Sequence, residues 1–223
     1  MTTNLSAPYK ALRSPLPPGW ELTVGCDTGT YMSAVFEAIP PGDSPAAIAI
    51  AEFPNYRYVG HEIELLGLST PEWARHVYLA FRYFCPRIER CKAWADANTQ
   101  FRAELAHYGL DLRPNLRGPE LRVEIAREYL QAASPCRHFL APWLTILPYE
   151  IEHAHWPEDT TTAGRFMRVK HHDHTLDGME HALSRRPRGK FIEPTKQRSF
   201  LEQQFEQHRH SMPIARDPHL GRL

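Results

Sequence analysis

The chain has 223 residues, 42% of them hydrophobic, a size that suits one domain with extensions better than two full domains. Its 26 basic residues balance 26 acidic ones, so the net charge does not indicate a nucleic-acid partner, and any case for one must rest on local clustering. The absence of an apolar run of about 20 residues excludes a membrane-spanning helix. With no signal-peptide core and no CxxC pair, we expect a soluble intracellular protein without a disulfide scaffold or zinc knuckle.

The two ends of the chain differ in composition from the middle. Residues 1–19 are rich in Pro and Ser, which predicts an extended N-terminal arm. Residues 191–223 are polar and mixed in charge and lack a convincing apolar stripe, which predicts a C-terminal tail. We therefore expect one domain over residues 20–190.

The first half of this domain has the pattern of strands. Residues 21–27, 30–39 and 46–53 are predicted strands, separated by turn signals at Thr28-Gly29 and at Pro40-Pro41-Gly42-Asp43. Short turns between successive strands favour an antiparallel meander.

The pattern then becomes helical. A helix is predicted to start at Thr70, with Pro71 in its first turn and an apolar face that includes Trp73 and Phe81. The further expected elements are a strand at 89–95, a helix at 98–108, a short strand at 110–114 and helices at 119–131 and 173–185. A strand that follows a crossover helix is expected to pair in parallel. The sequence therefore predicts an α/β fold with a mixed sheet flanked by helices.

Acidic residues stand where this architecture would bring them together. Asp27 ends the first strand and Asp96 ends the fourth, so their carboxylates would face each other if those strands are adjacent. Asp173 and Asp177, one turn apart on the last helix, could close the cluster. Such a set of hard oxygen ligands favours two Mg²⁺ or Mn²⁺ ions and phosphodiester hydrolysis. Each acid alone is also a common turn former or helix cap.

Basic residues flank the last helix. Seven basic residues lie between positions 165 and 190: Arg165, Arg168, Lys170, Arg185, Arg186, Arg188 and Lys190. Basic side chains beside an acidic metal site are what binding to a phosphate backbone requires. The alternative interpretation is a solvated charged surface.

Three segments carry a resemblance to a known family: residues 24–29 (VGCDTG), 94–101 (WADANTQF) and 173–183 (DHTLDGMEHAL). They resemble the nuclease domain of the large terminase subunit of tailed bacteriophages, which has the ribonuclease H-like fold. The resemblance covers about residues 20–188.

The last of these segments departs from the family pattern. The family typically carries D-H-x-x-D-A-x-R-Y, whereas here Gly178 replaces Ala, and Glu180 and His181 stand where Arg and Tyr are common. These departures keep the acids and the histidine of the motif. They leave open how the helix packs.

The resemblance implies a metal-dependent endonuclease that cuts concatemeric double-stranded DNA during genome packaging. It implies that Asp27 bridges two Mg²⁺ or Mn²⁺ ions, that Asp96 holds one, and that Asp177 or Asp173 completes the second site. It also implies that His174 positions a metal-bound water or contacts the scissile phosphate. The alternative for His174 is an ordinary surface or capping histidine.

The chain lacks the G-x-x-x-x-G-K-[ST] phosphate loop of the ATPase motor that large terminases carry. It is then either a nuclease portion separated from its motor or a stand-alone subunit, and the start at Met1 slightly favours the second. The resemblance implies a separate ATPase motor, a small terminase and a portal as partners, in the cytoplasm of the infected bacterial host.

Two other functions stay open from the sequence. A Holliday-junction resolvase or another structure-selective nuclease would use the same carboxylates. A DNA-binding packaging module that has lost its chemistry would keep the fold alone.

Overall fold

The fold is described from a computed structural model. It describes residues 15–42, 46–86, 91–95, 99–108, 112–115, 117–131, 137–154 and 172–186. All of these lie within the first of two units of the chain, Met1–Lys190. Among them, no helix is both long enough and apolar enough to span a bilayer.

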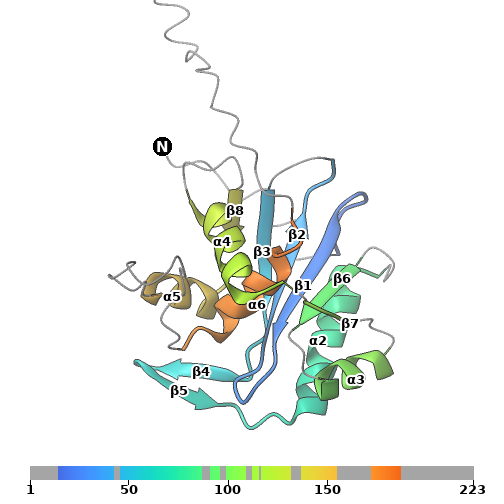
Figure 1. The fold of residues 1–223 in the computed structure, drawn as a ribbon. Helices are drawn as coiled ribbons and strands as arrows, with labels where there is room; N and C mark the ends of the chain where they lie inside the picture. Colours follow the sequence, from blue (N-terminus) through green and yellow to red (C-terminus); the bar gives the residue numbers. More distant parts are fainter. Residues whose placement is uncertain are drawn as a thin grey trace, which may run out of the picture. The chain divides into compact units, whose positions relative to one another are not determined.

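A six-stranded mixed sheet forms the centre of the fold, in the order β7-β6-β1-β2-β3-β8 (Figure 1). Its strands are β1 (Glu21–Asp27), β2 (Ser33–Ile39), β3 (Ala46–Glu52), β6 (Cys91–Ala95), β7 (Leu112–Pro114) and β8 (Arg137–Leu140). β1, β2 and β3 form the expected antiparallel meander, and β6 pairs in parallel with β1. β7 continues in parallel on β6, and β8 pairs in parallel with β3. The first and fourth predicted strands, β1 and β6, are therefore adjacent, which is the condition for Asp27 and Asp96 to face each other.

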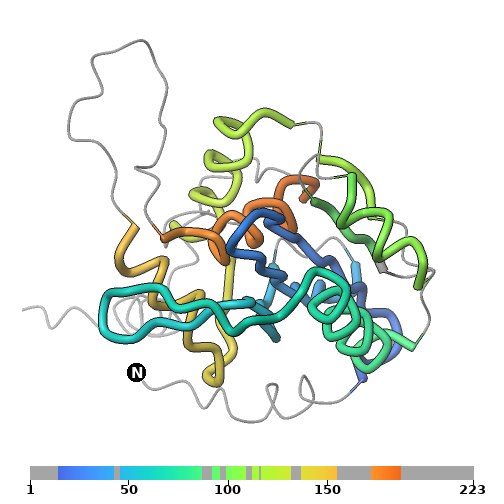
Figure 2. Tube along the Cα trace, turned by 90° about the horizontal axis from the view of Figure 1, so that it is seen from below, coloured from blue at the N-terminus to red at the C-terminus, as the bar shows by residue number. Residues whose placement is uncertain are grey.

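Helices cover both faces of the sheet. They are α2 (Thr70–Phe84), α3 (Thr99–His107), α4 (Pro119–Leu130), α5 (Ile146–His153) and α6 (His174–Leu183). Figure 2 shows α2 on one side of the sheet and α4 and α6 on the other. This is the predicted α/β architecture.

The sequence pattern missed four elements. These are the two-stranded hairpin of β4 (Tyr56–Val59) and β5 (Glu62–Leu65), strand β8, and helix α5. The hairpin strands have four residues each, the shortest run over which alternation indicates a strand. Pro148 lies inside α5, but it falls in the first turn, where a backbone N–H has no partner within the helix.

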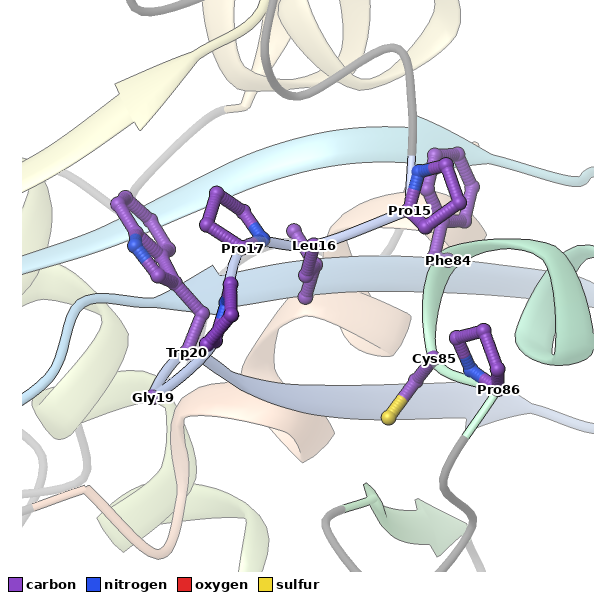
Figure 3. Close-up of a pocket in the computed structure, with 9 residues that line it drawn as sticks. Pro15, Leu16, Pro17, Gly19, Trp20, Phe84, Cys85 and Pro86 are labelled. Carbon is purple, nitrogen blue, oxygen red and sulfur yellow. The ribbon is translucent and has the colours of Figure 1, made fainter.

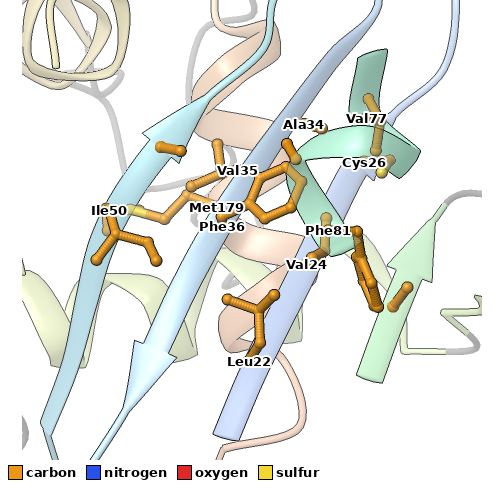
Figure 4. Close-up of a cluster of buried hydrophobic side chains, with 14 of the residues drawn as sticks. Leu22, Val24, Cys26, Ala34, Val35, Phe36, Ile50, Val77, Phe81 and Met179 are labelled. Carbon is orange, nitrogen blue, oxygen red and sulfur yellow. The ribbon is translucent and has the colours of Figure 1, made fainter. Parts of the chain in front are cut away.

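Alternation along β1 divides the core between the two faces of the sheet. Leu22, Val24 and Cys26 are buried on the face that α2 covers, where Figure 4 shows Val77 and Phe81 beside them. Residues at odd positions of β1 point to the opposite face, which α6 covers. The last of these is Asp27. The alternation therefore directs Asp27 to the same side of the sheet as α6.

Two glycines let α6 lie directly on β1. A Cβ atom at Gly25 would overlap the carbonyl oxygen of Gly178 and the backbone nitrogen of Ala182. A Cβ at Gly178 would lie 3.2 Å from Oγ of Ser33 and 3.3 Å from the carbonyl oxygen of Gly25. The glycine that departs from the family pattern therefore faces the sheet at a point of backbone contact.

The segment before β1 packs against the end of α2. The N–H of Leu16 donates to the carbonyl oxygen of Phe84 at 2.8 Å, and a cavity of about 330 Å³ lies between the two segments (Figure 3). Its lining is made of Pro, Leu, Gly, Trp, Phe and Cys residues and contains no acid or base. The cavity lies beside Trp20, at the opposite end of β1 from Asp27, so its chemistry and its place both exclude it as the candidate site.

The close approach at Gly25 gives a stability prediction. Gly25→Ala should destabilise the fold by about 3 kcal/mol or more, because the added methyl would overlap backbone atoms that cannot rotate away. Gly29→Ala is the matched control, since a Cβ there meets nothing within 4 Å. Urea denaturation followed by circular dichroism measures both. Equal stability of the two variants would contradict the packing of α6 on β1.

Candidate active site

The candidate site begins where β1 ends. Asp27, the last residue of β1, pairs with Ser33 of β2, and the preceding Cys26 pairs with Ala95, the last residue of β6. Asp96 directly follows Ala95 in the sequence and lies outside the described residues. The ends of β1 and β6 are therefore neighbours.

His174, the first residue of α6, reaches this strand end. Its Nδ1 donates to Oδ2 of Asp27 at 3.0 Å, between residues 147 positions apart in the chain. Its ring lies 5.0 Å from the ring of Tyr31 and 5.8 Å from that of Tyr56, measured between centroids. Ser33 Oγ donates to the carbonyl oxygen of His174 at 2.7 Å. Both the ring and the backbone of His174 are thus fixed against β1, β2 and their loops.

The two acids of α6 lie at its start and are buried. Asp173 is the N-cap residue, 5% exposed, and Asp177 is in the first turn, 6% exposed. The N–H of Asp177 donates to the carbonyl oxygen of Asp173 at 2.8 Å. Since the ring of His174 bonds to Asp27 and its carbonyl oxygen accepts from Ser33 Oγ, the first turn of α6 is held at the end of β1.

Asn55, which sequence analysis did not single out, holds the loop after Asp27. Its Oδ1 accepts the N–H of Met32 at 2.8 Å, and its Nδ2 donates to the carbonyl oxygen of Thr30 at 3.1 Å. The side chain is 3% exposed. A buried amide that satisfies both a donor and an acceptor of one loop restricts the conformations of that loop.

Sequence analysis also missed a buried polar network at the start of α6. Glu150 of α5 accepts the N–H of Leu176 on Oε2 at 2.8 Å. Its Oε1 accepts from the hydroxyls of Tyr56 at 2.6 Å and Tyr58 at 3.0 Å. These tyrosines are 94 and 92 positions from Glu150 in the chain, so no local sequence pattern could reveal the network.

Burial controls the ionisation of this network. Desolvation raises the pKa of Glu150 to about 7, although the hydrogen bonds from Tyr56, Leu176 and Tyr58 act in the opposite direction. Desolvation, together with the charge of Glu150, also raises the pKa of Tyr56 and of Tyr58 well above the usual tyrosine range. Glu150 is therefore the ionisable group of this network that titrates near neutral pH.

The pKa of His174 reflects two opposed effects. Burial of the imidazole lowers its pKa, but the hydrogen bond from His174 to Asp27 and the charges of Asp27, Glu150 and Asp173 raise it. The balance is a pKa above the ordinary histidine value. The protonated ring is therefore stabilised beside the carboxylates.

The predicted DNA-contacting residues fall into two groups. Five lie outside the described residues: Arg165, Arg168, Lys170, Arg188 and Lys190. The other two follow the C-terminal end of α6. The guanidinium of Arg185 lies 4.9 Å from the ring centroid of Trp94, and Arg186 donates to the carbonyl oxygen of Ala46 at 3.3 Å. Both follow the last residue of α6, whereas Asp173 precedes its first.

The donor set has the chemistry that Mg²⁺ and Mn²⁺ favour. Asp27, Asp173 and Asp177 offer hard carboxylate oxygens at adjoining ends of β1 and α6. Within the described part of the chain, no three His, Cys, Asp or Glu side chains gather as a metal-binding group. The fourth expected ligand, Asp96, is not in that part. These donors have the right chemistry for a divalent metal, and a site that they would complete together with Asp96 at the β6 end stays a prediction.

Comparison with known proteins gives a fold match. The sequence matches no protein-family profile and no curated protein. Among solved structures, the large terminase of a thermophilic bacteriophage matches with a TM-score of 0.56 and 16% identity over 76% of this chain. The large terminase nuclease domain (g2p) of bacteriophage SPP1 with bound Mn matches with a TM-score of 0.52 and 15% identity, covering 81% of this chain and 90% of that domain.

A third structure, the large terminase nuclease of the thermophilic phage G20c with bound magnesium, has a TM-score of 0.50 and 13% identity, covering 77% of this chain and 85% of that one. The chain spans 41% of the length of the first of these proteins, the large terminase. It thus has the ribonuclease H-like fold of terminase nuclease domains. The resemblance seen in the sequence is confirmed at the level of the fold.

Glu150 gives a prediction on pH and stability. Its pKa is about 7 in the folded protein, against an ordinary value of 4.5. Between these two pKa values the folded protein keeps a proton that the unfolded chain has lost. The stabilisation is therefore fully present below pH 4.5, the pKa in the unfolded chain, and is lost as pH rises through about 7, the pKa in the folded protein. For a shift of this size the loss is up to about 3 kcal/mol.

Urea denaturation at several pH values, in the wild type and in Glu150→Gln, isolates this contribution. The variant cannot ionise, so its stability relative to wild type should increase between about pH 5 and about pH 8. A difference that stays constant with pH would contradict the assignment.

Proposed function

We propose that the chain is a divalent-metal-dependent endonuclease that cuts double-stranded DNA, acting as the nuclease of a phage terminase on concatemeric viral DNA. The contact between His174 and Asp27, which joins the start of α6 to the end of β1, is the observation that carries this proposal. It unites two of the three segments that resemble the terminase nuclease. The fold match and the bound Mn and magnesium of the SPP1 and G20c nucleases support it.

Asp27, Asp96 and Asp177 would hold two Mg²⁺ or Mn²⁺ ions, with Asp173 as the alternative or additional ligand from α6. When bound, such ions activate a water and stabilise the leaving oxygen of a phosphodiester. The aspartates would orient the ions, and burial of the α6 acids would limit competing water. With Nδ1 of His174 engaged by Asp27, we assign contact with a phosphate oxygen or a water to Nε2.

The flanking basic residues would bind the DNA backbone. The set is Arg165, Arg168, Lys170, Arg185, Arg186, Arg188 and Lys190. Contacts of this kind fix DNA without reading its sequence, and they weaken as salt rises. We therefore propose cleavage with little sequence preference.

Movement of DNA would come from other proteins. The chain contains no phosphate loop, so a separate or detached ATPase motor, with a small terminase and a portal, would complete the packaging complex. The site of action would be the cytoplasm of the infected bacterial host. The phage large terminase of which this chain spans 41% has also been solved in complex with ATP-γ-S.

Nicking of supercoiled plasmid in Mn²⁺ or Mg²⁺ tests this proposal. Asp27→Asn and Asp177→Asn should each reduce the rate at least about 100-fold, because each removes a ligand charge from the site. Glu21→Gln is the matched control: Glu21 is an acid of the same strand, at its opposite end, where it pairs with Lys92 at 3.0 Å. It should retain the full rate.

Two outcomes would overturn the proposal. Full activity of Asp27→Asn would remove Asp27 from the site. Strict preference for four-way junctions over linear duplex would replace the terminase function with that of a junction resolvase.

A further inference from the structure

We infer that Glu150, Tyr56 and Tyr58, here named the Tyr–Glu clamp, are positioning residues that set the start of α6 for metal binding. The inference rests on the proposed function. The clamp residues come from α5 and β4, and neither element supplies a predicted metal ligand. They would act through the backbone of α6.

Glu150 is the centre of the clamp. Its side chain is 2% exposed, and both carboxylate oxygens are engaged. One oxygen accepts the N–H of Leu176, which lies in the first turn of α6 and has no acceptor within that helix. The other oxygen accepts from the two tyrosines of β4. The carboxylate therefore ties three elements, α5, α6 and β4, to one point.

The tyrosines hold the residues on either side of Asp173 and His174. The single hydroxyl hydrogen of Tyr58 is shared between Glu150 Oε1 at 3.0 Å and the carbonyl oxygen of His172 at 2.8 Å. The hydroxyl of Tyr56 accepts the N–H of Thr175 at 3.1 Å and lies 2.7 Å from Thr175 Oγ1. Asp173 and His174 lie between these two held residues. A positioned backbone on both sides restricts where the carboxylate and the imidazole can point.

The backbone before α6 is in a conformation that needs such support. His172 has a φ of +50°, in the left-handed region that non-glycine residues rarely adopt. Residues in this region persist where the surrounding structure holds them. The hydrogen bond from Tyr58 to the His172 carbonyl supplies that constraint directly before Asp173.

The clamp is itself anchored to the sheet. Glu52, the last residue of β3, accepts the N–H groups of Thr145, Ile146 and Leu147 at 2.6, 2.8 and 2.7 Å. This carboxylate caps α5 in the way that Glu150 caps α6. The position of α6 is thus connected through α5 to β3, in the same sheet that carries Asp27.

Tyr58→Phe is the most selective test, because it removes the hydroxyl and keeps the ring that packs 4.4 Å from the ring of Tyr149. Glu150→Ala removes the central acceptor, and Glu150→Gln should restore function because an amide can still accept from Leu176 and bond to a tyrosine hydroxyl. Tyr78→Phe, on α2, is the matched tyrosine control; its ring stacks on Tyr108, away from α6.

Three measurements are made on each protein: the Mn²⁺ concentration that gives half of the metal-induced rise in Tm, amide hydrogen exchange at residues 173–177 without metal, and plasmid nicking. Tyr58→Phe and Glu150→Ala should raise the half-saturating Mn²⁺ concentration about tenfold or more and speed the exchange. Glu150→Gln and Tyr78→Phe should stay near wild type.

The outcomes separate the two proposals. If the wild type binds Mn²⁺ and cuts DNA while Tyr58→Phe and Glu150→Ala keep the wild-type Mn²⁺ half-saturation, the clamp inference is overturned and the proposed function stands. If these variants have a lower Tm but an unchanged half-saturating Mn²⁺ concentration, the clamp has a merely structural role, and the clamp inference is again overturned. If the wild type neither binds Mn²⁺ nor cuts DNA, the proposed function fails, and the clamp inference fails with it.

Discussion

Backbone contact between α6 and β1 is the constraint on which the candidate site depends. Gly25 has no side chain, so the carbonyl oxygen of Gly178 and the backbone of Ala182 occupy the space that a Cβ would need. Helices usually pack on the side chains of a sheet, but α6 packs on the backbone of β1. This brings Nδ1 of His174 to 3.0 Å from Oδ2 of Asp27. With any larger residue at position 25, the helix would have to move away from the strand, and the strand end and the helix start would separate.

Carboxylates hold the helices around this contact. Glu52 binds the start of α5, and Glu150 binds the start of α6, so each helix N-terminus receives a negative group that its free N–H groups favour. The arrangement has a cost, since burial of Glu150 raises its pKa to about 7 and so opposes its charged form. Glu150 is a buried acid beside other acids. An apolar side chain in its place could not accept the N–H of Leu176.

Local features of the sequence predicted much of the fold and part of the site. The bounds of β1 and the start of α2 agree with the prediction, because Asp27 precedes a Gly turn and Pro71 marks a helix start. Asp27 and His174 were predicted site residues, and the structure brings them together. The roles of all the predicted site residues stay predictions, and Asp96 and five of the basic residues lie outside the described ranges. Asn55, Glu150 and the β4 tyrosines were missed because their partners are distant in sequence and because four residues are the shortest run over which alternation indicates a strand.

The most direct test of this account is anomalous X-ray diffraction from crystals of the protein grown with Mn²⁺. The account predicts Mn²⁺ bound by the carboxylate of Asp27 together with Asp177 or Asp173 of α6, with Asp96 as a further ligand. Mn²⁺ bound only at other residues, or a carboxylate of Asp27 that binds no Mn²⁺ when the metal is present in excess, would contradict it.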